Sequence, residues 1–300
     1  MSREDAERLA DERVARRAAR DFNAADALRD RIAALGFEVV DRPHGYDLRP
    51  LGAEGDTGEP RIRPADVPSV LDRPPTADWA VQWLHEGWMD DVLRGIRSFR
   101  AQESGRAVQH VVVESEPMGR GAWPEGTEVV PLDGDPGFGA ARNTGLRRSM
   151  GRLVMIVDGS VEATGDVFGP LEDALRDNAV GACGPFCLVT DDLREFRDTP
   201  GPEADAVEGY LIALRREVLE RGVAFDTKFR FYRAADIDLS FRVKDLGLRV
   251  VRVDVPVTRH QHRRWTATSE ADRARLSKRN FYRFLDRFRG RTDLLVSGGR

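Results

Sequence analysis

Four acidic residues stand directly after apolar runs in the 300-residue sequence, namely Glu86, Glu114, Asp133 and Asp158. Carboxylates at such positions can accept hydrogen bonds from a base or a ribose, or hold a hard cation through their oxygen atoms. In an open α/β sheet, ligands bind beyond the carboxyl ends of the strands. These acids are therefore the first candidates for a binding site, although acids are also common at strand ends simply because strand ends are exposed.

A glycine-rich segment follows Asp133 and reads Asp-Gly-Asp-Pro-Gly-Phe-Gly-Ala-Ala-Arg-Asn-Thr-Gly-Leu over residues 133–146. Gly137 and Gly139 allow a close backbone approach at the start of a helix, where free N–H groups favour an anion such as a diphosphate. Arg142 adds a fixed positive charge. A glycine pair alone is a weak signal, but the string followed by the apolar run 151–157 and Asp158 is far more specific.

The elements that must position these residues follow from the apolar pattern. From residue 78 onward, short apolar runs alternate with segments of helical spacing; the predicted strands are 79–84, 108–114, 128–132 and 153–157, and the predicted helices include residues 92–99 and 140–150. Strands that are apolar on both faces and separated by helices are typical of a mostly parallel sheet covered on both sides. The sequence therefore predicts an α/β fold.

At this point the chain resembles the family 2 glycosyltransferases. The resemblance lies in the Gly-x-x-x-Ala-Arg-Asn-x-Gly run at 137–145, the strand and Asp-x-Ser at 153–160, Glu-Gly-Tyr at 208–210, Phe-Asp at 225–226 and Ala-Asp-Ile-Asp-Leu at 235–239. It covers roughly residues 78–265. It implies a Rossmann-like A-type glycosyltransferase fold, with a mostly parallel mixed sheet, that binds a nucleoside-diphosphate sugar donor.

The resemblance also implies roles for individual residues. Glu114 matches the acid that contacts the nucleoside, and Asp158 matches the first acid of Asp-x-Asp, which holds Mg²⁺ or Mn²⁺ against the diphosphate. Asp236 matches the general base of the inverting members, which removes the proton of the acceptor hydroxyl. The candidate donor-binding residues are then Glu86, Glu114, Gly137, Gly139, Arg142 and Asn143.

The sequence departs from the family pattern in the middle of the expected site. Ser160 stands where a second metal-binding acid is expected, and Ala235 replaces the Glu that precedes the base. His260 or His262, which flank Gln261, could complete a metal site, although a structural histidine is an equally ordinary interpretation. These departures keep open a non-catalytic protein of the same fold that binds a nucleotide sugar or a partner.

Residues 1–50 predict a separate small module. Helical spacing in 3–35 indicates a helical hairpin, and 37–48 alternates like a short strand pair turning through Pro43 and His44. The run 19–32 and Gly-Phe-Glu-Val-Val-Asp at 36–41 resemble the C-terminal piece of cysteinyl-tRNA synthetases, which belongs to the part of those enzymes that engages tRNA. A docking or oligomerisation element is the other interpretation. Residues 51–77, rich in Gly, Pro, Asp and Arg, predict a linker.

Residues 268–300 predict a basic amphipathic helix and tail after the domain at 78–267. Leu276, Phe281 and Phe284 recur at helical spacing among many arginines. Such a helix could lie on an anionic membrane surface and suit a lipid-linked acceptor. It could equally pack on the catalytic domain with a solvated basic face. The acceptor class, whether glycan, lipid or small molecule, does not follow from the sequence.

The bulk composition limits the remaining alternatives. Lys plus Arg total 47 against 51 acids, so a surface built as a whole for nucleic acid is not expected. No run approaches the ~18 apolar residues of a membrane span, and the N-terminus lacks a secretion signal, so we expect a cytoplasmic protein, in contact with the membrane at most at its surface. Cys183 and Cys187 are too few for a structural zinc site and are expected to be buried thiols.

Overall fold

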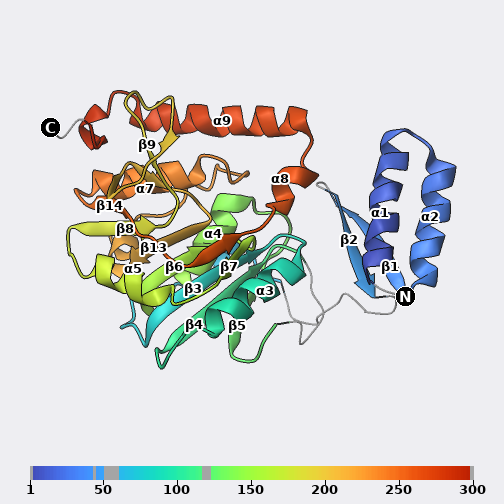
Figure 1. Cartoon of the computed structure of the whole chain (residues 1–300), viewed down its shortest axis with the longest axis horizontal. Coiled ribbons are helices and arrows are strands. Elements are labelled where there is room, and N and C mark those ends of the chain that lie inside the picture. Colours follow the sequence, from blue (N-terminus) through green and yellow to red (C-terminus); the bar gives the residue numbers. More distant parts are fainter. Residues whose placement is uncertain (1–2, 43–44, 51–60, 117–122, 298–300) are drawn as a thin grey trace.

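A computed structural model describes residues 3–42, 45–50, 61–116 and 123–297 of the chain (Figure 1). Its main body is built on an eight-stranded sheet with the order β11-β14-β8-β13-β6-β3-β4-β5. The strands are β3 (Ala77–His85), β4 (Val108–Glu114), β5 (Thr127–Pro131), β6 (Gly151–Val157), β8 (Val180–Gly184), β11 (Glu203–Ala204), β13 (Leu211–Arg215) and β14 (Arg249–Arg252).

The sheet is mixed, with a parallel half that carries the predicted strands. Strand β3 pairs in parallel with β4 and β6, and β4 pairs in parallel with β5. Strand β13 runs antiparallel between β6 and β8, while β14 pairs in parallel with β8. The apolar runs at 79–84, 111–113 and 154–157 are buried in the middle of this sheet, as their lack of a polar face predicts. The expected α/β fold with a mostly parallel mixed sheet is confirmed.

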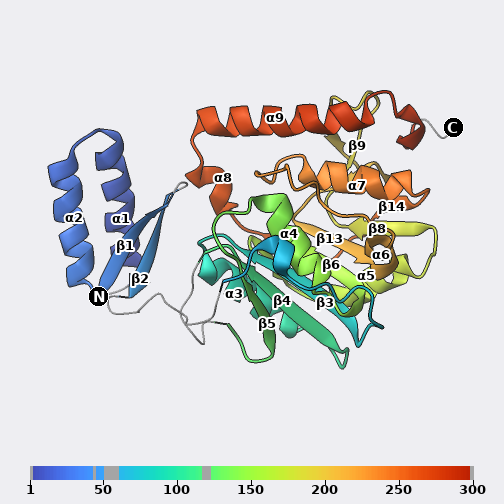
Figure 2. The ribbon, with the colours of Figure 1, turned by 180° about the vertical axis from the view of Figure 1, so that it is seen from behind.

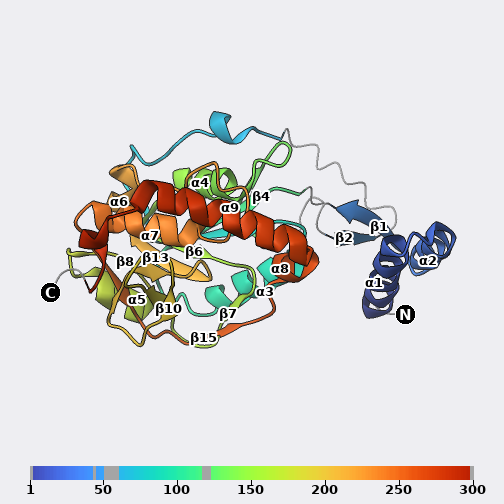
Figure 3. The same ribbon diagram turned by 90° about the horizontal axis from the view of Figure 1, so that it is seen from above.

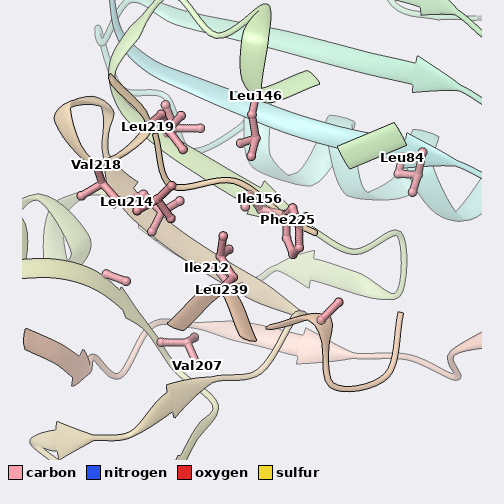
Figure 4. Close-up of a cluster of buried hydrophobic side chains, with 14 of the residues drawn as sticks. Leu84, Leu146, Ile156, Val207, Ile212, Leu214, Val218, Leu219, Phe225 and Leu239 are labelled. Atoms are coloured by element: carbon pink, nitrogen blue, oxygen red, sulfur yellow. The ribbon is translucent and has the colours of Figure 1, made fainter. Parts of the chain in front are cut away.

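Helices cover both faces of the sheet. Helices α3 (Met89–Arg100) and α5 (Phe168–Leu175) lie on one face (Figure 1), and α4 (Phe138–Arg147), α6 (Arg216–Glu220) and α7 (Ala235–Asp245) lie on the other, which is seen from behind (Figure 2). On the first face, Trp83 and Phe99 pack edge to face. On the second, Ile156, Ile212 and Leu239 belong to one buried cluster (Figure 4). Two cores therefore hold the carboxyl ends of β3, β4 and β6 in place.

Two smaller strand groups extend the body beside the sheet. Strand β7 (Val161–Ala163) pairs with β15 (Val257–Arg259), and β9 (Cys187–Val189) pairs with both β10 (Arg197–Asp198) and β12 (Ala206–Val207). The β7–β15 pair brings the segment after β6 next to the segment that holds both candidate histidines. The predicted buried thiols are confirmed, since Cys183 on β8 of the main sheet and Cys187 on β9 are both buried and free.

The C-terminal helix α9 (Glu270–Phe288) lies across α7 (Figure 3). The short helix α8 (Arg263–Ala267) precedes it, and a 3₁₀ turn, η2 (Thr292–Leu294), follows it. Its apolar face is used inside the protein, because Phe284 and Phe288 pack against Phe241 of α7 with ring centroids 5.1 and 5.4 Å apart. Arg287 adds an ion pair of 2.7 Å to Asp238, which is fully buried. This helix therefore packs on the domain, and its apolar face is not available to a bilayer. In the described residues, no helix is long and apolar enough to cross a membrane.

The N-terminal module has its own small core. Helices α1 (Arg3–Ala18) and α2 (Phe22–Ala34) pack on the antiparallel strands β1 (Phe37–Arg42) and β2 (Gly45–Pro50). The side chains of Leu9, Leu28, Ile32, Val39 and Leu48 are buried together. The turn that we predict through Pro43 and His44 lies outside the described residues.

Half of the predicted linker is packed against the domain. Residues 51–60 lie outside the described residues, but Ile62 forms a parallel bridge with Leu132, and Val70 is only 2% exposed. Arg216 donates to the carbonyl oxygens of Val70 and Arg73, each at 2.7 Å. Residues 61–77 include the 3₁₀ turn η1 (Pro64–Asp66). The composition of the linker predicts a free segment, yet a few apolar residues and the buried Arg216 hold 61–77 against the domain.

Candidate active site

One cavity of about 280 Å³ brings together acids from distant parts of the chain. It lies where β6 ends, β13 begins and α7 begins. Its polar and aromatic lining includes Asp158, Glu208, Tyr210, Tyr232, Arg233, Asp236, His262 and Trp265. Asp158 and Asp236, which the sequence separates by 78 positions, therefore share one cavity.

Asp158 is held at the end of β6 by contacts to both of its carboxylate oxygens. Oδ1 accepts hydrogen bonds from the backbone N–H and the hydroxyl of Ser160, and Oδ2 lies 3.4 Å from Nε2 of His262. Burial by itself would raise the pKa of Asp158. The contacts with His262 and Ser160, together with the charge of Arg142, outweigh burial and hold this pKa below its ordinary value. Asp158 is therefore an ionised carboxylate at the cavity wall.

The two candidate histidines lie in different surroundings. His262 is stacked on Tyr232, with ring centroids 4.3 Å apart, and packs edge-on to Tyr210. The ring of His260 instead reaches Glu162, with Nε2 2.7 Å from Oε2, and is not part of the cavity lining. Of this pair, His262 is the one placed beside Asp158.

The donors around Asp158 suit a divalent cation that takes further ligands from a substrate. One carboxylate, one imidazole and the Ser160 hydroxyl are the nitrogen and oxygen donors that Mn²⁺ accepts, and oxygen donors suit Mg²⁺. Within the described ranges, no three or more Asp, Glu, His or Cys residues group as a metal site. A cation here would therefore depend on a substrate diphosphate to complete its coordination.

Asp236 stands in the first turn of α7 and lines the same cavity. Its Oδ2 accepts the N–H of Gly209 at 2.8 Å, and its Oδ1 accepts the N–H of Ile237 at 2.9 Å. Burial raises the pKa of Asp236, and the Gly209 hydrogen bond and the charge of Arg233 offset that rise only in part. A carboxylate with a raised pKa is a better proton acceptor near neutral pH.

A second carboxylate, Glu208, lines the same cavity next to Asp236. Burial and the charge of Asp236 raise the pKa of Glu208. Arg259 lies 3.7 Å from Glu208 and also covers the rings of Phe186 and Tyr210, at 4.3 and 4.9 Å from the ring centroids. The sequence marks Glu208 only as part of Glu-Gly-Tyr, with no role attached.

Arg233 and its neighbours are the residues that the sequence interpretation missed most clearly. The exposed Arg233 lines the cavity with its guanidinium 5.5 Å from the ring centroid of Trp265. In the part of the chain that the structure describes, Arg233 has no carboxylate within 4.0 Å. The available signal was position, since Tyr232 and Arg233 directly precede the segment with Asp236.

The glycine turn has a different role from the one its sequence suggests. The N–H groups of Phe138 and Gly139 donate to the carbonyl oxygens of Arg230 and Phe229, at 3.2 and 2.8 Å. A Cβ atom on Gly139 would lie 2.3 Å from the carbonyl oxygen of Asp226, and one on Gly137 would lie 3.0 Å from Cα of Arg230. The expected diphosphate site is corrected accordingly: these glycines admit the segment 226–230, which occupies the start of α4.

Arg142 and Asn143 also face inward, away from the cavity. Arg142 is 2% exposed and donates from Nη1 to the carbonyl oxygen of Val157 at 3.2 Å; burial lowers its pKa to about 10. Asn143 exchanges two hydrogen bonds with the backbone of Phe225, at 2.7 and 2.8 Å. Arg142 therefore stabilises the charge of Asp158 and does not contact a sugar donor directly. Asn143 joins α4 to the segment before α7.

Glu86 and Glu114 occupy the expected strand ends but have protein partners. Glu86 forms an ion pair with Arg264 and lines a small cavity of about 40 Å³ that also includes Asp158 and His262. The buried Glu114 accepts a hydrogen bond from the indole N–H of Trp123. Both acids lie on the same edge of the sheet as Asp158, and Glu86 is the one that shares a cavity with it.

Solved structures of glycosyltransferases share this fold at low sequence identity. GalNAc-T7 with UDP, GalNAc and Mn²⁺ matches with a TM-score of 0.56 and 15% identity, over 72% of this chain and 48% of that chain. The chain thus spans about half the length of that protein. The mannosyltransferase PcManGT from Pyrobaculum calidifontis, in complex with GDP-Man and Mn²⁺, has a TM-score of 0.47 and 20% identity, over 67% and 59% of the two chains.

A third match is the catalytic domain of Drosophila β1,4-galactosyltransferase 7 with xylobiose, with a TM-score of 0.43 and 13% identity, over 62% and 71% of the two chains. No protein-family model matches this chain, and no curated protein sequence matches it either. The likeness to GalNAc-T7 shows that the main body has an A-type glycosyltransferase fold. The finer resemblance to family 2, and that of residues 1–50 to the synthetases, stay predictions.

Proposed function

We propose that this protein is a nucleotide-sugar-dependent glycosyltransferase that moves a sugar from a nucleoside-diphosphate donor to an acceptor hydroxyl with inversion. The observation that carries the proposal is the shared cavity of Asp158 and Asp236 on an A-type glycosyltransferase fold. The cavity is lined by an ionised carboxylate, Asp158, and by a carboxylate of raised pKa, Asp236. Direct displacement needs a proton acceptor for the attacking hydroxyl and a separate group that faces the leaving diphosphate, and these two carboxylates could fill the two roles.

Asp236 is the proposed general base. Two backbone N–H groups fix its carboxylate, from Gly209 and from Ile237. One oxygen lone pair of each hydrogen-bonded atom remains for the proton of an acceptor hydroxyl in the cavity. Glu208 is not proposed for this role, because its side chain is engaged by Arg259.

Asp158 and His262, with the hydroxyl of Ser160, are the residues proposed to hold Mg²⁺ or Mn²⁺. The cation would neutralise the charge of the departing diphosphate. Support comes from the donor atoms around Asp158 and from the Mn²⁺ bound in the GalNAc-T7 structure, which has a similar fold. The choice between Mg²⁺ and Mn²⁺ would then depend more on the diphosphate than on Asp158 and His262.

We propose that Arg233, and not the glycine turn, binds the diphosphate of the donor through its positive charge. Its guanidinium lies in the cavity with no carboxylate within 4.0 Å among the described residues. Glu86 and Glu114 remain the proposed contacts of the nucleoside, because Glu86 directly follows β3 and Glu114 ends the neighbouring strand β4. The acceptor is proposed to be a glycan, lipid or small molecule with a free hydroxyl. A membrane contact would have to rest on the charges of α9, since its apolar face is buried.

The test is a turnover assay with UDP-, GDP- and dTDP-sugars, with and without Mn²⁺, that measures release of the nucleoside diphosphate. We expect one donor class to be consumed by the wild-type protein and not by Asp236→Asn. The control is Asp135→Asn, whose side chain is 77% exposed and lies outside the cavity. Equal turnover in wild type and Asp236→Asn would rule out the proposed base.

A second candidate is a non-catalytic protein that binds a nucleotide sugar. It is favoured by one observation: Ser160 and His262 already occupy the oxygens of Asp158. A donor that raises the melting temperature of the wild-type protein, without any turnover in the presence of acceptors, would support this candidate. Salt-sensitive tRNA binding that is lost on removal of residues 1–50 would instead support an RNA-associated protein.

A further inference from the structure

Asn280 of α9 contacts the loop that leads into the proposed base. It is fully buried, and its side-chain amide donates to the carbonyl oxygens of Phe231 and Arg233, at 2.7 and 2.9 Å. Between these two carbonyls lies Tyr232, and Arg233 follows it; both side chains line the cavity. One side chain of the C-terminal helix therefore holds both ends of the segment that supplies them.

The residue after this segment has an unfavourable backbone conformation. Ala234 has φ +63° and ψ 0°, in the left-handed region that residues with a Cβ atom adopt at a free-energy cost. The turn is closed by hydrogen bonds of 3.1 Å from Ala235 N–H to the Tyr232 carbonyl and from Asp238 N–H to the Ala234 carbonyl. A strained residue of this kind persists only where its surroundings hold it.

The position of Asn280 is set by contacts that do not involve this loop. One turn along α9, Phe284 is fully buried and its ring lies 5.1 Å from Phe241 and 5.9 Å from Phe196. Two turns along, Arg287 pairs with Asp226 and Asp238 at 2.8 and 2.7 Å. Helix α9 is thus anchored on α7, and Asn280 is a rigid donor on that anchor.

We propose that Asn280 is a positioning residue: it holds 231–234 in the left-handed turn, so that Arg233 and Asp236 face the cavity. The inference rests on the proposed function, because that function gives Arg233 and Asp236 their roles. The claim that Asn280 holds this turn does not depend on any activity, because it concerns only the backbone of Ala234, which would otherwise relax away from φ +63°. Released from Asn280, the turn would take Asp236 off the N–H of Gly209.

The first experiment removes the hydrogen-bond donor of Asn280 in two ways. Asn280→Asp presents carboxylate oxygens to two carbonyl oxygens, and Asn280→Ala removes the contact without adding a charge. We expect either variant to lower kcat about tenfold or more, because small misplacements of reacting groups have large effects on rate. The KM for the acceptor is expected to change by less than about threefold, since the rest of the cavity is unaltered.

The decisive experiment is a rescue in the loop itself. Glycine adopts φ +63° without the penalty of a Cβ atom, so Ala234→Gly removes the strain that Asn280 is proposed to hold. We expect Ala234→Gly alone to change kcat by less than about threefold, and Ala234→Gly in the Asn280→Ala protein to restore most of the lost kcat. Additive losses in the double variant would overturn the proposal.

A matched control separates positioning from general stability. Phe284→Leu weakens the packing of the same helix but touches neither Phe231 nor Arg233. At an equal loss of melting temperature, Phe284→Leu should retain near wild-type kcat. If Phe284→Leu and Asn280→Ala lose kcat in step with stability, Asn280 has no role beyond holding the helix.

Amide hydrogen exchange tests the loop without any assay of activity. The N–H of Ala235 and the N–H of Gly209 are both bonded only while the turn holds its observed shape. Asn280→Ala should speed exchange at these two amides at least about tenfold, with the amides of β3 unchanged. A protein that exchanges as expected but transfers no sugar would refute the proposed function and leave the positioning role standing; unchanged exchange would refute the positioning role.

Discussion

Two helices begin at the wall of the same cavity, and they begin in opposite ways. At the start of α4, Gly137 and Gly139 let another backbone segment lie on the helix, and the N–H groups of Phe138 and Gly139 donate to that segment. At the start of α7, the left-handed residue is Ala234, and Asp236 in the first turn faces the cavity. The conspicuous glycine motif thus serves packing, while the less conspicuous start carries the proposed chemistry.

The difference teaches how to interpret a glycine-rich helix start. Glycine is required where another group approaches the backbone closely, but the approaching group can be protein as well as ligand. Here the carbonyl oxygens of Phe229 and Arg230 take the positions that an anion would take. Phe229 and Arg230 belong to the segment that continues into Tyr232 and Arg233, so α4 supports the cavity through this segment.

The largest expected effect lies at the start of α7. Asp236→Asn keeps the side chain's size and its acceptance of the Gly209 N–H but cannot take a proton. Because a general base contributes about 10²–10⁴ in rate, we expect kcat for transfer to fall by about that factor, with donor affinity retained. Calorimetric binding of the donor to the variant is the control measurement. A loss of donor binding in step with kcat would mean that Asp236 holds substrate instead.

Gly139→Ala tests the other helix start. A Cβ atom 2.3 Å from the Asp226 carbonyl oxygen forces the segment off α4, so we expect the free energy of unfolding to fall by about 2 kcal/mol. Thermal or urea unfolding measures this change. The KM for the donor should rise only together with the loss of stability, because the displaced segment continues into Arg233, which lines the cavity. A raised donor KM with unchanged stability would return the diphosphate to the glycine turn.

The paired histidines sharpen the comparison at the Asp158 wall. His262→Ala removes the imidazole 3.4 Å from Asp158 and should weaken Mn²⁺ binding about tenfold or more, whether it acts as a ligand or orients one. His260→Ala is the matched control, since its ring contacts Glu162, and should leave Mn²⁺ binding unchanged. The measurement is the affinity for the nucleotide-sugar donor at increasing Mn²⁺ concentration. Equal effects of the two variants would exclude His262 from the metal site.

The smallest expected effect is a shift in pH dependence. The pKa of Asp236 is raised above the ordinary 3.8 by burial, so transfer should fall as the pH drops through that raised value, at a higher pH than an exposed Asp would give. A raised carboxyl pKa contributes stability that is fully present below pH 3.8 and is lost as pH rises through the folded pKa. The stability of Asp236→Asn relative to the wild type should therefore increase as the pH rises from acid to neutral, which urea unfolding at several pH values measures.

Local pattern was enough to predict the architecture. The runs at 79–84, 108–114 and 153–157 are mostly apolar on both faces, which favours buried strands, and the helical segments between them favoured a parallel arrangement. The amphipathic pattern of α9 and the helical hairpin at the N-terminus followed from 3.6-residue spacing in the same way, but spacing left open whether the apolar face of α9 meets a membrane or the domain. Periodicity reports whether a segment's own faces are buried, and this information is contained in the segment.

Only the tertiary structure decided which residues meet at the cavity. Asn143 bonds to Phe225, Asn280 bonds to Arg233, and His262 rather than His260 reaches Asp158. Each of these contacts joins segments at least 47 positions apart, and no local spacing records which segment will lie against which. The sequence by itself determined the strands, the helices and the acids at their ends; folding determined the partners, because contact between distant segments depends on the packing of the whole sheet.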